Sequence, residues 1–387
     1  MTRRVLITGA RAAAALDLAR DFAAAGWTVH LADCVKVRMA RWSRVSASHH
    51  LYPAPRQDGA SFRAWTARFV SDNEIDLIVP TCEEVFHLAA PSLHKQLGGK
   101  LFAPDLATLR SLHDKLAFAR SCSEWGLDVP ESHSIADAAA LAPFMGSSRE
   151  WVFKPRFSRF GDKALIAPPS GAVARIDPNA DAPWLAQRYI DGEEACFHAV
   201  AHRGRLIAYT AYRSDWCLGG GARYAFEPTE SRHYDALRAI AEKLAKSAGI
   251  HGQFACDVML SSDGKYYLLE CNPPATSGVH LLVGNGDLAK AIEDGRPMPQ
   301  RASRAAYLAP AMALFGLPLA LRDNRFAEWK ALLTTGHDAI SRPGDRAPIF
   351  GAVADAAGFF LTGLKHGIST NAATTFDIEW NGEELDR

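Results

Sequence analysis

The stretch QFACDVMLSSDGKYYLLECN, residues 253–272, decides the fold, because it predicts two strands joined by a tight turn. Asp263-Gly264 is the turn signal, since a two-residue type I′ hairpin needs positive φ at both central positions. With these two residues as the loop, Asp257 on the first strand faces Glu270 on the second. Side chains alternate along a strand, so both carboxylates lie on one face of the predicted hairpin.

The predicted register has a chemical consequence. Leu260 faces Tyr267, and Asn272 lies on the face of Glu270, diagonal to Asp257. Two carboxylates directly opposite each other repel, and a cation between them offsets the repulsion. An all-oxygen set of two carboxylates and an amide suits Mg²⁺ or Mn²⁺, with phosphate oxygens completing the shell. The alternative is a solvated polar face. We also expect that replacing both carboxylates by amides leaves the fold of the metal-free hairpin intact.

Composition bounds the class of protein. The chain has 387 residues, with 43 basic and 43 acidic side chains, which predicts two to three domains with ample core. Balanced charge argues against nucleic acid or a membrane surface as the main partner. Seven cysteines without a CxxC pair fit a reducing cytosol and give no zinc signal. Gly9, Arg11 and Asp17 interrupt the first apolar run, which makes a poor signal peptide, so a cytoplasmic protein is expected.

The beginning of the chain predicts a parallel sheet. Residues 4–9 form a short apolar strand pattern, residues 12–25 have helical spacing, and residues 27–32 form a second strand pattern. This order is typical of a right-handed βαβ unit. The turn after Gly9 lacks the second and third glycines of a dinucleotide fingerprint, so we reject NAD binding. Asp33 is expected to cap the strand end.

The next strand pattern, residues 75–80, precedes two candidate substrate ligands. Residues just past the carboxyl ends of parallel strands line the ligand crevice of such sheets. Thr81 and Glu83 are therefore candidates for substrate contact. A helix N-cap and a first-turn acid explain the same residues equally well. Residues 101–104 are expected to add a further short strand.

Two lysines precede a polar loop. Lys115 lies in the first turns of a helix predicted over residues 111–125, where a cation does not stabilise the helix. Lys154 lies among apolar neighbours in a strand pattern over residues 151–155. The loop at 156–161 has the Ser, Gly and Arg residues that can cover phosphates, but it is not a Walker loop. A phosphate ligand explains Lys115, and a surface lysine is the alternative.

Further patterns lead into the hairpin. A strand pattern runs over residues 184–190. The glycine loop, residues 212–228, holds three consecutive glycines between Arg213 and Arg223 and is able to close over a ligand, or else is a plain flexible connection. Residues 231–249 predict an amphipathic helix.

Two other patterns carry no predicted chemistry. Arg203-Gly204 marks another hairpin turn. Residues 301–387 mix helix and strand patterns, with a late strand expected at residues 375–380.

The ordered set of two lysines, a Ser/Gly loop, a strand-end segment and the hairpin carboxylates resembles the ATP-grasp superfamily. That superfamily includes D-alanine–D-alanine ligase, biotin carboxylase and the carbamoyl-phosphate synthetase large subunit. The resemblance covers about residues 1–290. It implies a mixed α/β ATP-grasp fold with an N-terminal βαβ parallel-sheet domain. Four parts are expected: an N-terminal domain at 1–104, a first lobe with a lid at 105–186, a second lobe with the metal site at 187–300, and an α/β extension at 301–387.

The resemblance implies nucleotide-binding roles. Lys115 and Lys154 would hold the α- and β-phosphates, and Glu194 would bind the ribose hydroxyls. The loop that closes over the triphosphate would use Ser158, Arg159 and Gly161. The hinge that contacts adenine would be formed by Gln187, Arg188, Tyr189 and Ile190. The ligands of two Mg²⁺ ions, which bridge the β- and γ-phosphates of ATP, would be Asp257, Glu270 and Asn272.

Two positions depart from the pattern of the superfamily. Gln187 stands where many relatives have Glu, and Pro274 stands where many have a catalytic Arg. Either Arg213 or Arg223 replaces that arginine, or the chemistry at the acceptor end is altered. Ser277 and its neighbours are able to supply N–H and hydroxyl donors there.

The resemblance implies an ATP-dependent ligase. A small carboxylate would form an acyl phosphate and then join an amine, with release of ADP and phosphate. One alternative is a non-amine acceptor, and another is an ATP-binding module without turnover. A homodimer is a further expectation from the family.

Overall fold

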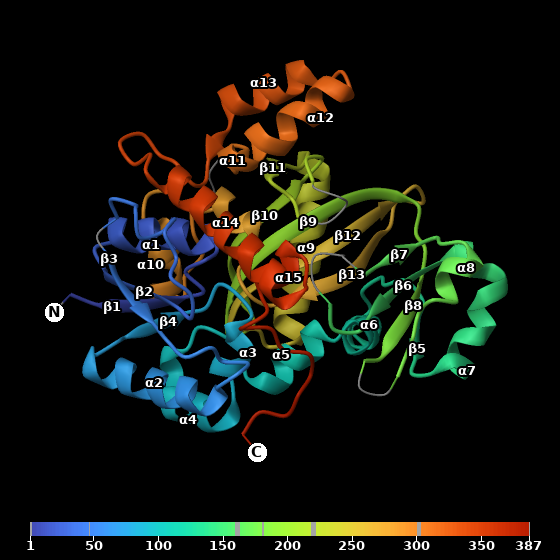
Figure 1. The fold of residues 1–387 in the computed structure, drawn as a ribbon, viewed down its shortest axis with the longest axis horizontal. Helices are drawn as coiled ribbons and strands as arrows, with labels where there is room; N and C mark the ends of the chain where they lie inside the picture. Colours follow the sequence, from blue (N-terminus) through green and yellow to red (C-terminus); the bar gives the residue numbers. More distant parts are fainter. Residues whose placement is uncertain are drawn as a thin grey trace.

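Three β-sheets frame the molecule in the computed structural model, which describes residues 2–45, 47–158, 163–179, 182–217, 222–299 and 303–386 (Figure 1). A parallel sheet lies at the N-terminal end, a small antiparallel sheet lies at the opposite end, and a larger sheet lies between them. This arrangement agrees with the predicted mixed α/β class. The division of the chain after residues 104, 186 and 300 remains a prediction.

The parallel sheet begins with the predicted βαβ unit. Strand β1 (Arg4–Thr8), helix α1 (Ala13–Ala24) and strand β2 (Thr28–Asp33) follow in order, and the strands pair in parallel. Strands β3 (Ala47–Leu51) and β4 (Leu77–Val79) complete the order β3-β2-β1-β4. The strand expected at residues 101–104 is reduced to one bridge between Leu101 and Ile78.

Short helices surround this sheet. They are α2 (Gly59–Asp72), α3 (Glu84–Leu88), α4 (Pro91–Leu97) and the 3₁₀ turn η1 (Gly98–Lys100). Phe62, Thr66 and Val70 repeat at every fourth position and form the buried stripe of α2, as expected for an amphipathic helix.

The helix predicted over residues 111–125 is in fact two helices. Helix α5 (Leu106–His113) ends before Asp114, and α6 (Lys115–Glu124) begins after it. The Asp114 carboxylate accepts hydrogen bonds from the N–H groups of Leu116 and Ala117, so it caps α6 and starts a new helix axis. Lys115 therefore occupies the first position of a helix.

The small antiparallel sheet has the order β5-β8-β6-β7. Its strands are β5 (Ser132–Ile135), β6 (Trp151–Pro155), β7 (Leu165–Ile166) and β8 (Trp184–Arg188). The helical segments beside them are α7 (Ala138–Leu141), η2 (Ala142–Glu150) and α8 (Ser170–Val173).

The large sheet has the order β13-β12-β9-β10-β11-β14-β15. Its strands are β9 (Gly192–His202), β10 (Arg205–Arg213), β11 (Ala225–Pro228), β12 (Gly252–Ser261), β13 (Tyr266–Asn272), β14 (Ala306–Tyr307) and β15 (His337–Asp338). Helix α9 (Ser231–Ser247) forms where the amphipathic pattern predicted it and packs on β10. Arg203 and Gly204 both have positive φ, so the predicted β9–β10 turn is confirmed.

The β12–β13 hairpin forms with the predicted carboxylate pair, although its turn differs. The Ser261 N–H donates to the Lys265 carbonyl, and Gly264 alone has positive φ. The loop therefore has three residues and not two. A bulge between Asp257 and Val258 then shifts the register back, so Asp257 still pairs with Glu270.

The shifted register contradicts one predicted strand pair. Leu260 pairs with Tyr266 and not with Tyr267. The pairing of Asp257 with Glu270 was therefore predicted correctly only because the extra loop residue and the bulge shift the register in opposite directions.

The C-terminal region is mainly helical. It follows η3 (Ser277–Leu281) and α10 (Asp287–Asp294), and contains α11 (Ala309–Ala311), the π-helical turn η4 (Met312–Gly316), α12 (Leu317–Arg322), α13 (Phe326–Thr335), α14 (Pro348–His366) and α15 (Thr370–Ala373). The strand predicted at residues 375–380 is wrong, because residues 375–378 form turns and residues 379–380 have no regular secondary structure. Trp380 is buried there and stacks on Phe86 with ring centroids 4.8 Å apart. No helix in the described ranges has both the length and the apolar character needed to cross a membrane.

Candidate active site

A cavity of about 810 Å³ lies where the three sheets meet. Its N-terminal wall is formed by residues 11–14 and 81–83, which follow the carboxyl ends of β1 and β4. This is the edge at which parallel sheets bind ligands. The β12–β13 hairpin, the end of β8 and parts of the C-terminal region supply the other walls. The sequence-predicted residues that line the cavity are Thr81, Glu83, Lys154, Ser158, Gln187, Arg188, Tyr189, Ile190, Glu194, Arg223, Asp257, Glu270, Asn272 and Ser277.

The predicted metal ligands lie together on the hairpin. Asp257 pairs with Glu270, and Asn272 pairs with Ala255 two positions along the same strand. All three side chains line the cavity. Their oxygen-only donor set fits a hard divalent cation whose shell is completed by other oxygens. Within the described part of the chain, no group of three or more His, Cys, Asp or Glu side chains is placed to hold a metal.

The two predicted phosphate lysines converge on one carboxylate oxygen. The Nζ atoms of Lys115 and Lys154 each lie 3.5 Å from Oε2 of Glu270. The Lys115 ammonium also donates to the Ser158 carbonyl at 3.0 Å. Both lysine side chains are less than one-tenth exposed. Lys115 comes from the start of α6 and Lys154 comes from strand β6. Both lysines thus meet at the hairpin, although they are distant from it in sequence.

The surroundings drive the two carboxylates in opposite directions. Burial raises the pKa of Asp257 to about 6, and the charge of Glu270 adds to the rise. Burial acts on Glu270 as well, but Lys115 and Lys154 outweigh it and lower its pKa to about 2. Burial lowers the pKa of Lys154, and the attraction of Glu270 opposes that change. Asp257 therefore carries the negative charge that is least compensated, and a bound divalent cation would compensate it.

The predicted glycine loop is shorter in the structure, because Arg213 ends β10 and residues 225–228 form β11. The two candidate arginines lie in different surroundings. Arg223 lines the cavity and forms an ion pair with Glu194. Arg213 is exposed and lies near Glu193 and Asp215, at 3.4 and 3.8 Å. Arg213 is not among the residues that line the cavity in the described structure.

The predicted adenine hinge follows the end of β8. Gln187 is buried, and its side-chain amide donates to the Ser132 hydroxyl at 3.3 Å. The Arg188 side chain is 43% exposed and pairs with Glu150. Tyr189 is half-exposed at the rim of the cavity. The backbone N–H groups of Arg188 and Tyr189 donate to the carbonyls of Glu131 and Glu150, both at 2.8 Å.

The loop predicted to cover phosphates is only partly described. The Ser158 hydroxyl donates to the Pro155 carbonyl at 3.3 Å, and Ser158 lines the cavity. The predicted positions Arg159 and Gly161 lie outside the described residues.

Thr81 and Glu83 have structural partners in addition to their place at the cavity. The Thr81 hydroxyl donates to the carbonyls of Thr8 and Gly9, at 2.7 and 3.0 Å. The Glu83 carboxylate accepts the Trp380 N–H at 3.2 Å. These contacts join β1, β4 and the C-terminal segment at the wall of the cavity.

Sequence reasoning missed Arg11 and the C-terminal wall. Arg11 is buried and pairs with Asp33 and Asp377. Asp33 also accepts the backbone N–H of Arg11 at 2.8 Å, which agrees with its expected role at the strand end. Phe359 and Thr374 line the cavity from a region with no assigned chemistry. No local pattern marked these residues, because they reach the cavity only through tertiary packing.

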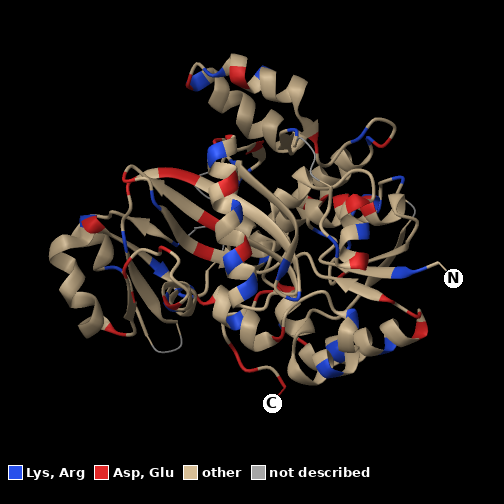
Figure 2. Cartoon of the chain, turned by 180° about the vertical axis from the view of Figure 1, so that it is seen from behind, with Lys and Arg blue, Asp and Glu red and all other residues tan. Residues whose placement is uncertain are grey.

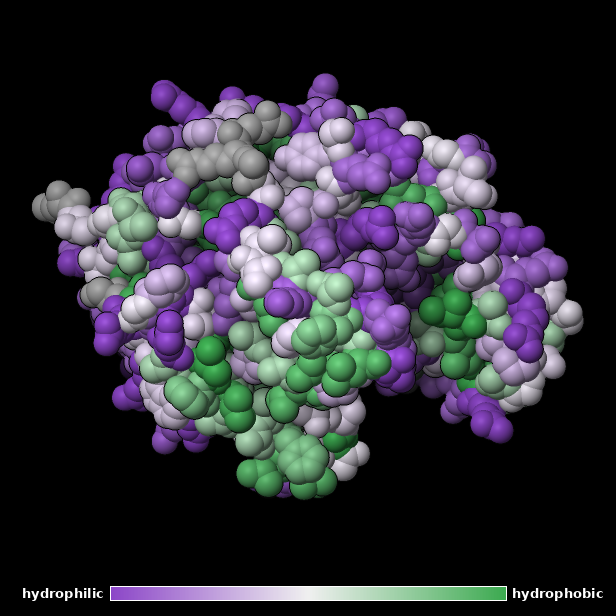
Figure 3. All heavy atoms as spheres, turned by 90° about the horizontal axis from the view of Figure 1, so that it is seen from above, coloured by the Kyte–Doolittle hydropathy of each residue, from purple (hydrophilic) through white to green (hydrophobic). Residues whose placement is uncertain are grey.

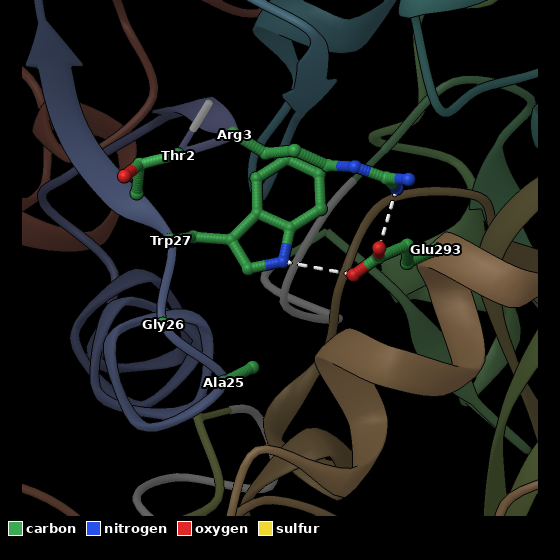
Figure 4. A pocket seen from close by; sticks show the side chains of 6 residues that line it. All are labelled: Thr2, Arg3, Ala25, Gly26, Trp27 and Glu293. Carbon is green, nitrogen blue, oxygen red and sulfur yellow. Dashed lines mark hydrogen bonds and ion pairs between the residues drawn. The ribbon is translucent and has the colours of Figure 1, made fainter.

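A separate hollow of about 440 Å³ opens at the amino ends of β1 and β2. Figure 4 shows the Glu293 carboxylate between Arg3 and the Trp27 indole, which donates to it at 3.1 Å. The polar groups of this hollow are engaged with one another, and ligands of parallel sheets bind at the opposite, carboxyl edge.

Basic and acidic positions are interspersed over the molecule, as the view from behind shows (Figure 2).

The three sheets and the lysine–carboxylate site define a class of fold: the chain has the ATP-grasp fold, and the resemblance seen in the sequence is confirmed at this level. No protein-family model matches the chain, and no curated protein matches it in sequence. Solved structures of ATP-grasp ligases do match it in three dimensions.

One match is the biotin carboxylase domain dimer of 2-oxoglutarate carboxylase from Hydrogenobacter thermophilus, solved with MgADP, ADP and bicarbonate. Its TM-score is 0.61 at 13% identity, over 78% of this chain and 71% of that chain. An L-amino acid ligase from Bacillus licheniformis has a TM-score of 0.54 at 14% identity, over 72% and 68%. Phosphoribosylamine–glycine ligase from Thermotoga maritima has 0.57 at 17%, over 78% and 79%.

Proposed function

We propose that this protein is an ATP- and Mg²⁺-dependent ligase that converts a small carboxylate into an acyl phosphate and joins it to an amine, with release of ADP and phosphate. The observation that carries the proposal is the meeting of Lys115 and Lys154 on Glu270, directly across the hairpin from Asp257. The cavity around them has the volume typical of small-molecule sites. The matching solved structures include a biotin carboxylase domain bound to MgADP, an L-amino acid ligase and a phosphoribosylamine–glycine ligase.

Each residue has a task in this proposal. Lys115 and Lys154 neutralise phosphate oxygens, since phosphoryl transfer depends on positioning and electrostatics. Asp257, Glu270 and Asn272 hold Mg²⁺, which would neutralise charge on the β- and γ-phosphates. The backbone of residues 187–190 binds adenine. Glu194 gives up its ion pair with Arg223 and binds the ribose of the nucleotide.

Arg223 is the better replacement for the arginine that is missing at Pro274. Its guanidinium lines the cavity next to Glu194. Burial acts to lower its pKa, but Cys196, Asp257 and Glu194 outweigh burial and raise the pKa. A permanently charged donor at this place would stabilise the acyl phosphate and the oxyanion of its tetrahedral adduct. Ser277, at the start of η3, adds a hydroxyl to the same wall.

The cavity suits a carboxylate with an apolar part. Phe226, Leu308 and Phe359 contribute apolar side chains there, and Thr374 and Thr375 contribute hydroxyl-bearing ones. Apolar walls with a few polar groups are typical of pockets that orient small molecules. Thr81 and Glu83 line the same cavity as candidate contacts.

The test is ADP release from Mg²⁺-ATP with pools of small carboxylates, each with and without pooled amines, and with hydroxylamine as a trap. We expect ADP release that needs a carboxylate, formation of a hydroxamate, and full turnover only when an amine is present. Hydroxamate without amine-dependent turnover indicates another acceptor. Tight ATP binding without ADP release indicates a binding module, and Pro274→Arg is then the first variant to examine.

A further inference from the structure

The outer face of helix α14 is apolar. Phe350 is 69% exposed, Phe360 is 52% exposed and Leu364 is 65% exposed. Val353 and Leu361 are exposed on the same side, and so are two alanines at positions 356 and 357. A surface helix normally presents charged residues to water and apolar ones to the core. The distribution in α14 is the reverse.

Packing fixes this orientation of the helix. The one charged side chain between positions 350 and 364, Asp355, points inward and accepts the N–H groups of Arg38 and Met39 at 2.9 and 2.8 Å. One turn earlier, a Cβ on Gly351 would lie 2.6 Å from the Met39 Cα, so the backbones are in close contact. Phe359, one turn later, faces the cavity. The inner face is therefore engaged, and the helix cannot rotate to bury its outer residues.

The patch continues onto the neighbouring helices. Leu314, Phe315, Leu321 and Phe326 are also 42–63% exposed on η4, α12 and α13. Figure 3 shows hydrophobic residues gathered into one patch on the side where α12 and α13 lie in Figure 1. Taking about 150–200 Å² for each fully exposed large side chain, the exposed fractions on α14 amount to roughly 500 Å² of apolar surface, and the residues on η4, α12 and α13 bring the total to roughly 800 Å². One side of a standard protein–protein interface buries about 800 Å², and the largest patch on a typical monomer is about 300–600 Å².

The spacing of the outer residues indicates a helical partner. Phe350, Val353, Ala357, Phe360 and Leu364 follow one another at alternating steps of three and four, as residues do at the seam of a helix pair. Small residues occupy the middle of this stripe, and large ones occupy both ends. Two antiparallel copies can therefore approach closely at the centre while their ends interdigitate.

We propose that this patch is the interface of a two-fold homodimer, with α14 packed antiparallel against α14 of a second copy about an axis at Ala357. In this register, Phe350 of one copy faces Leu364 of the other, and Val353 faces Leu361. The interface is isologous, so one patch serves both copies. The proposal is independent of the ligase function.

The charge pattern of α14 argues against a lipid surface. A helix that lies in a membrane interface carries Lys and Arg along its polar face. Helix α14 has Lys365 only at its C-terminal end. In the antiparallel pair, Lys365 of one copy lies near Arg346 of the other, so cations of like sign flank an apolar centre. Added salt therefore strengthens the association, whereas it would weaken binding to an anionic membrane.

The first experiment is sedimentation equilibrium of the full chain at several salt concentrations. We expect a dimer that tightens with salt. Leu361→Glu places a charge in the interface of both copies and raises the dissociation constant by about 100-fold or more. Leu51→Glu is the matched control, because Leu51 is 49% exposed on strand β3, away from α14, and it leaves the dimer unchanged. Circular dichroism and thermal unfolding verify that both variants fold.

A cysteine pair tests the register. Ala357→Cys lies on the proposed axis, opposite its own copy, so mild oxidation gives a disulfide-linked dimer. Lys365→Cys lies at the opposite end from its copy and gives none, and the unmodified chain is the background control. A chain that stays monomeric at all concentrations overturns the proposal, and so does a dimer that survives Leu361→Glu. Flotation of a monomeric chain with vesicles of phosphatidylcholine and phosphatidylserine would move the patch to a lipid surface.

Discussion

Asp257 and Glu270 lie directly opposite each other on neighbouring strands, yet only Glu270 has both lysine ammonium groups within 3.5 Å. The two carboxylates are therefore not equivalent. Glu270 is the counter-ion of Lys115 and Lys154 in the nucleotide-free protein. Asp257 faces it without a lysine partner and accepts a hydrogen bond from the Cys196 thiol at 2.9 Å.

This difference refines the expectation that both carboxylates can be replaced with the fold intact, because it predicts unequal effects on stability. Glu270→Gln leaves two buried ammonium groups without their carboxylate, and we expect a loss of about 3 kcal/mol in the free energy of unfolding. Asp257→Asn removes the repelling charge, and the protein without Mg²⁺ is expected to be equally stable or more stable. Urea unfolding in the presence of a chelator measures both. Equal losses for the two variants would contradict the asymmetry.

The lysines supply the second prediction, which depends on the proposed ligase activity. Lys154→Met keeps the length of the side chain but removes the charge beside the nucleotide phosphates. We expect carboxylate-dependent ADP release to fall by about 100-fold or more, because one fixed phosphate-neutralising group is worth about 3 kcal/mol in such sites. Lys265→Met is the matched control, since Lys265 is exposed in the turn of the same hairpin. A similar loss in both variants would show that the effect is not local.

The local signals in the sequence predicted the elements better than the turns and breaks. The hairpin was predicted from Asp263-Gly264, but the β-bulge after Asp257 had no signal of its own, and the correct pairing of Asp257 with Glu270 depended on a compensating error in the turn. Asp114 has the side chain of a helix cap, but the sequence pattern did not show that it also ends the preceding helix.

Contacts distant in sequence could not be predicted at all. Arg11 meets Asp377 only because the C-terminal segment crosses back over the first turn. The stretch 375–380 has the composition of a strand, yet burial of Trp380 against Phe86 determines its turn conformation. Tertiary packing overrides local propensity at such places.

The third prediction separates the two arginines of the glycine loop. Arg223→Ala removes a charge from the cavity wall, and we expect a loss of about 100-fold in ligase turnover with a smaller effect on ATP affinity. Arg213→Ala, at the exposed end of β10, is the control and should retain near-normal turnover. Steady-state kinetics with isothermal titration of ATP compare the two effects. If Arg213→Ala had the larger effect, the assignment of the replacement arginine would be reversed.

The last prediction concerns Asp17, which the sequence marked only as an interruption of the first apolar run. Asp17 is buried on α1 and accepts hydrogen bonds from His280 at 2.8 Å, Arg342 at 3.0 Å and Arg20 at 3.1 Å. Burial alone would raise its pKa, but His280 and the two arginines outweigh it and lower the pKa to about 2. This carboxylate therefore joins the parallel sheet to η3 and to the C-terminal region.

A depressed native pKa gives a definite sign. The unfolded chain binds the proton more tightly than the folded one, so the stabilisation is fully present above about pH 4 and is lost as the pH falls toward 2. Asp17→Asn should lower the free energy of unfolding at pH 7 by about 2–4 kcal/mol, because the buried cations lose their counter-ion. The deficit should shrink between pH 4 and 2, where the wild-type carboxylate takes up its proton. Urea unfolding at steps of pH follows this change, with the exposed Asp72→Asn as control. A deficit that stayed constant down to pH 2 would mean that packing, and not charge, accounts for the contribution of Asp17.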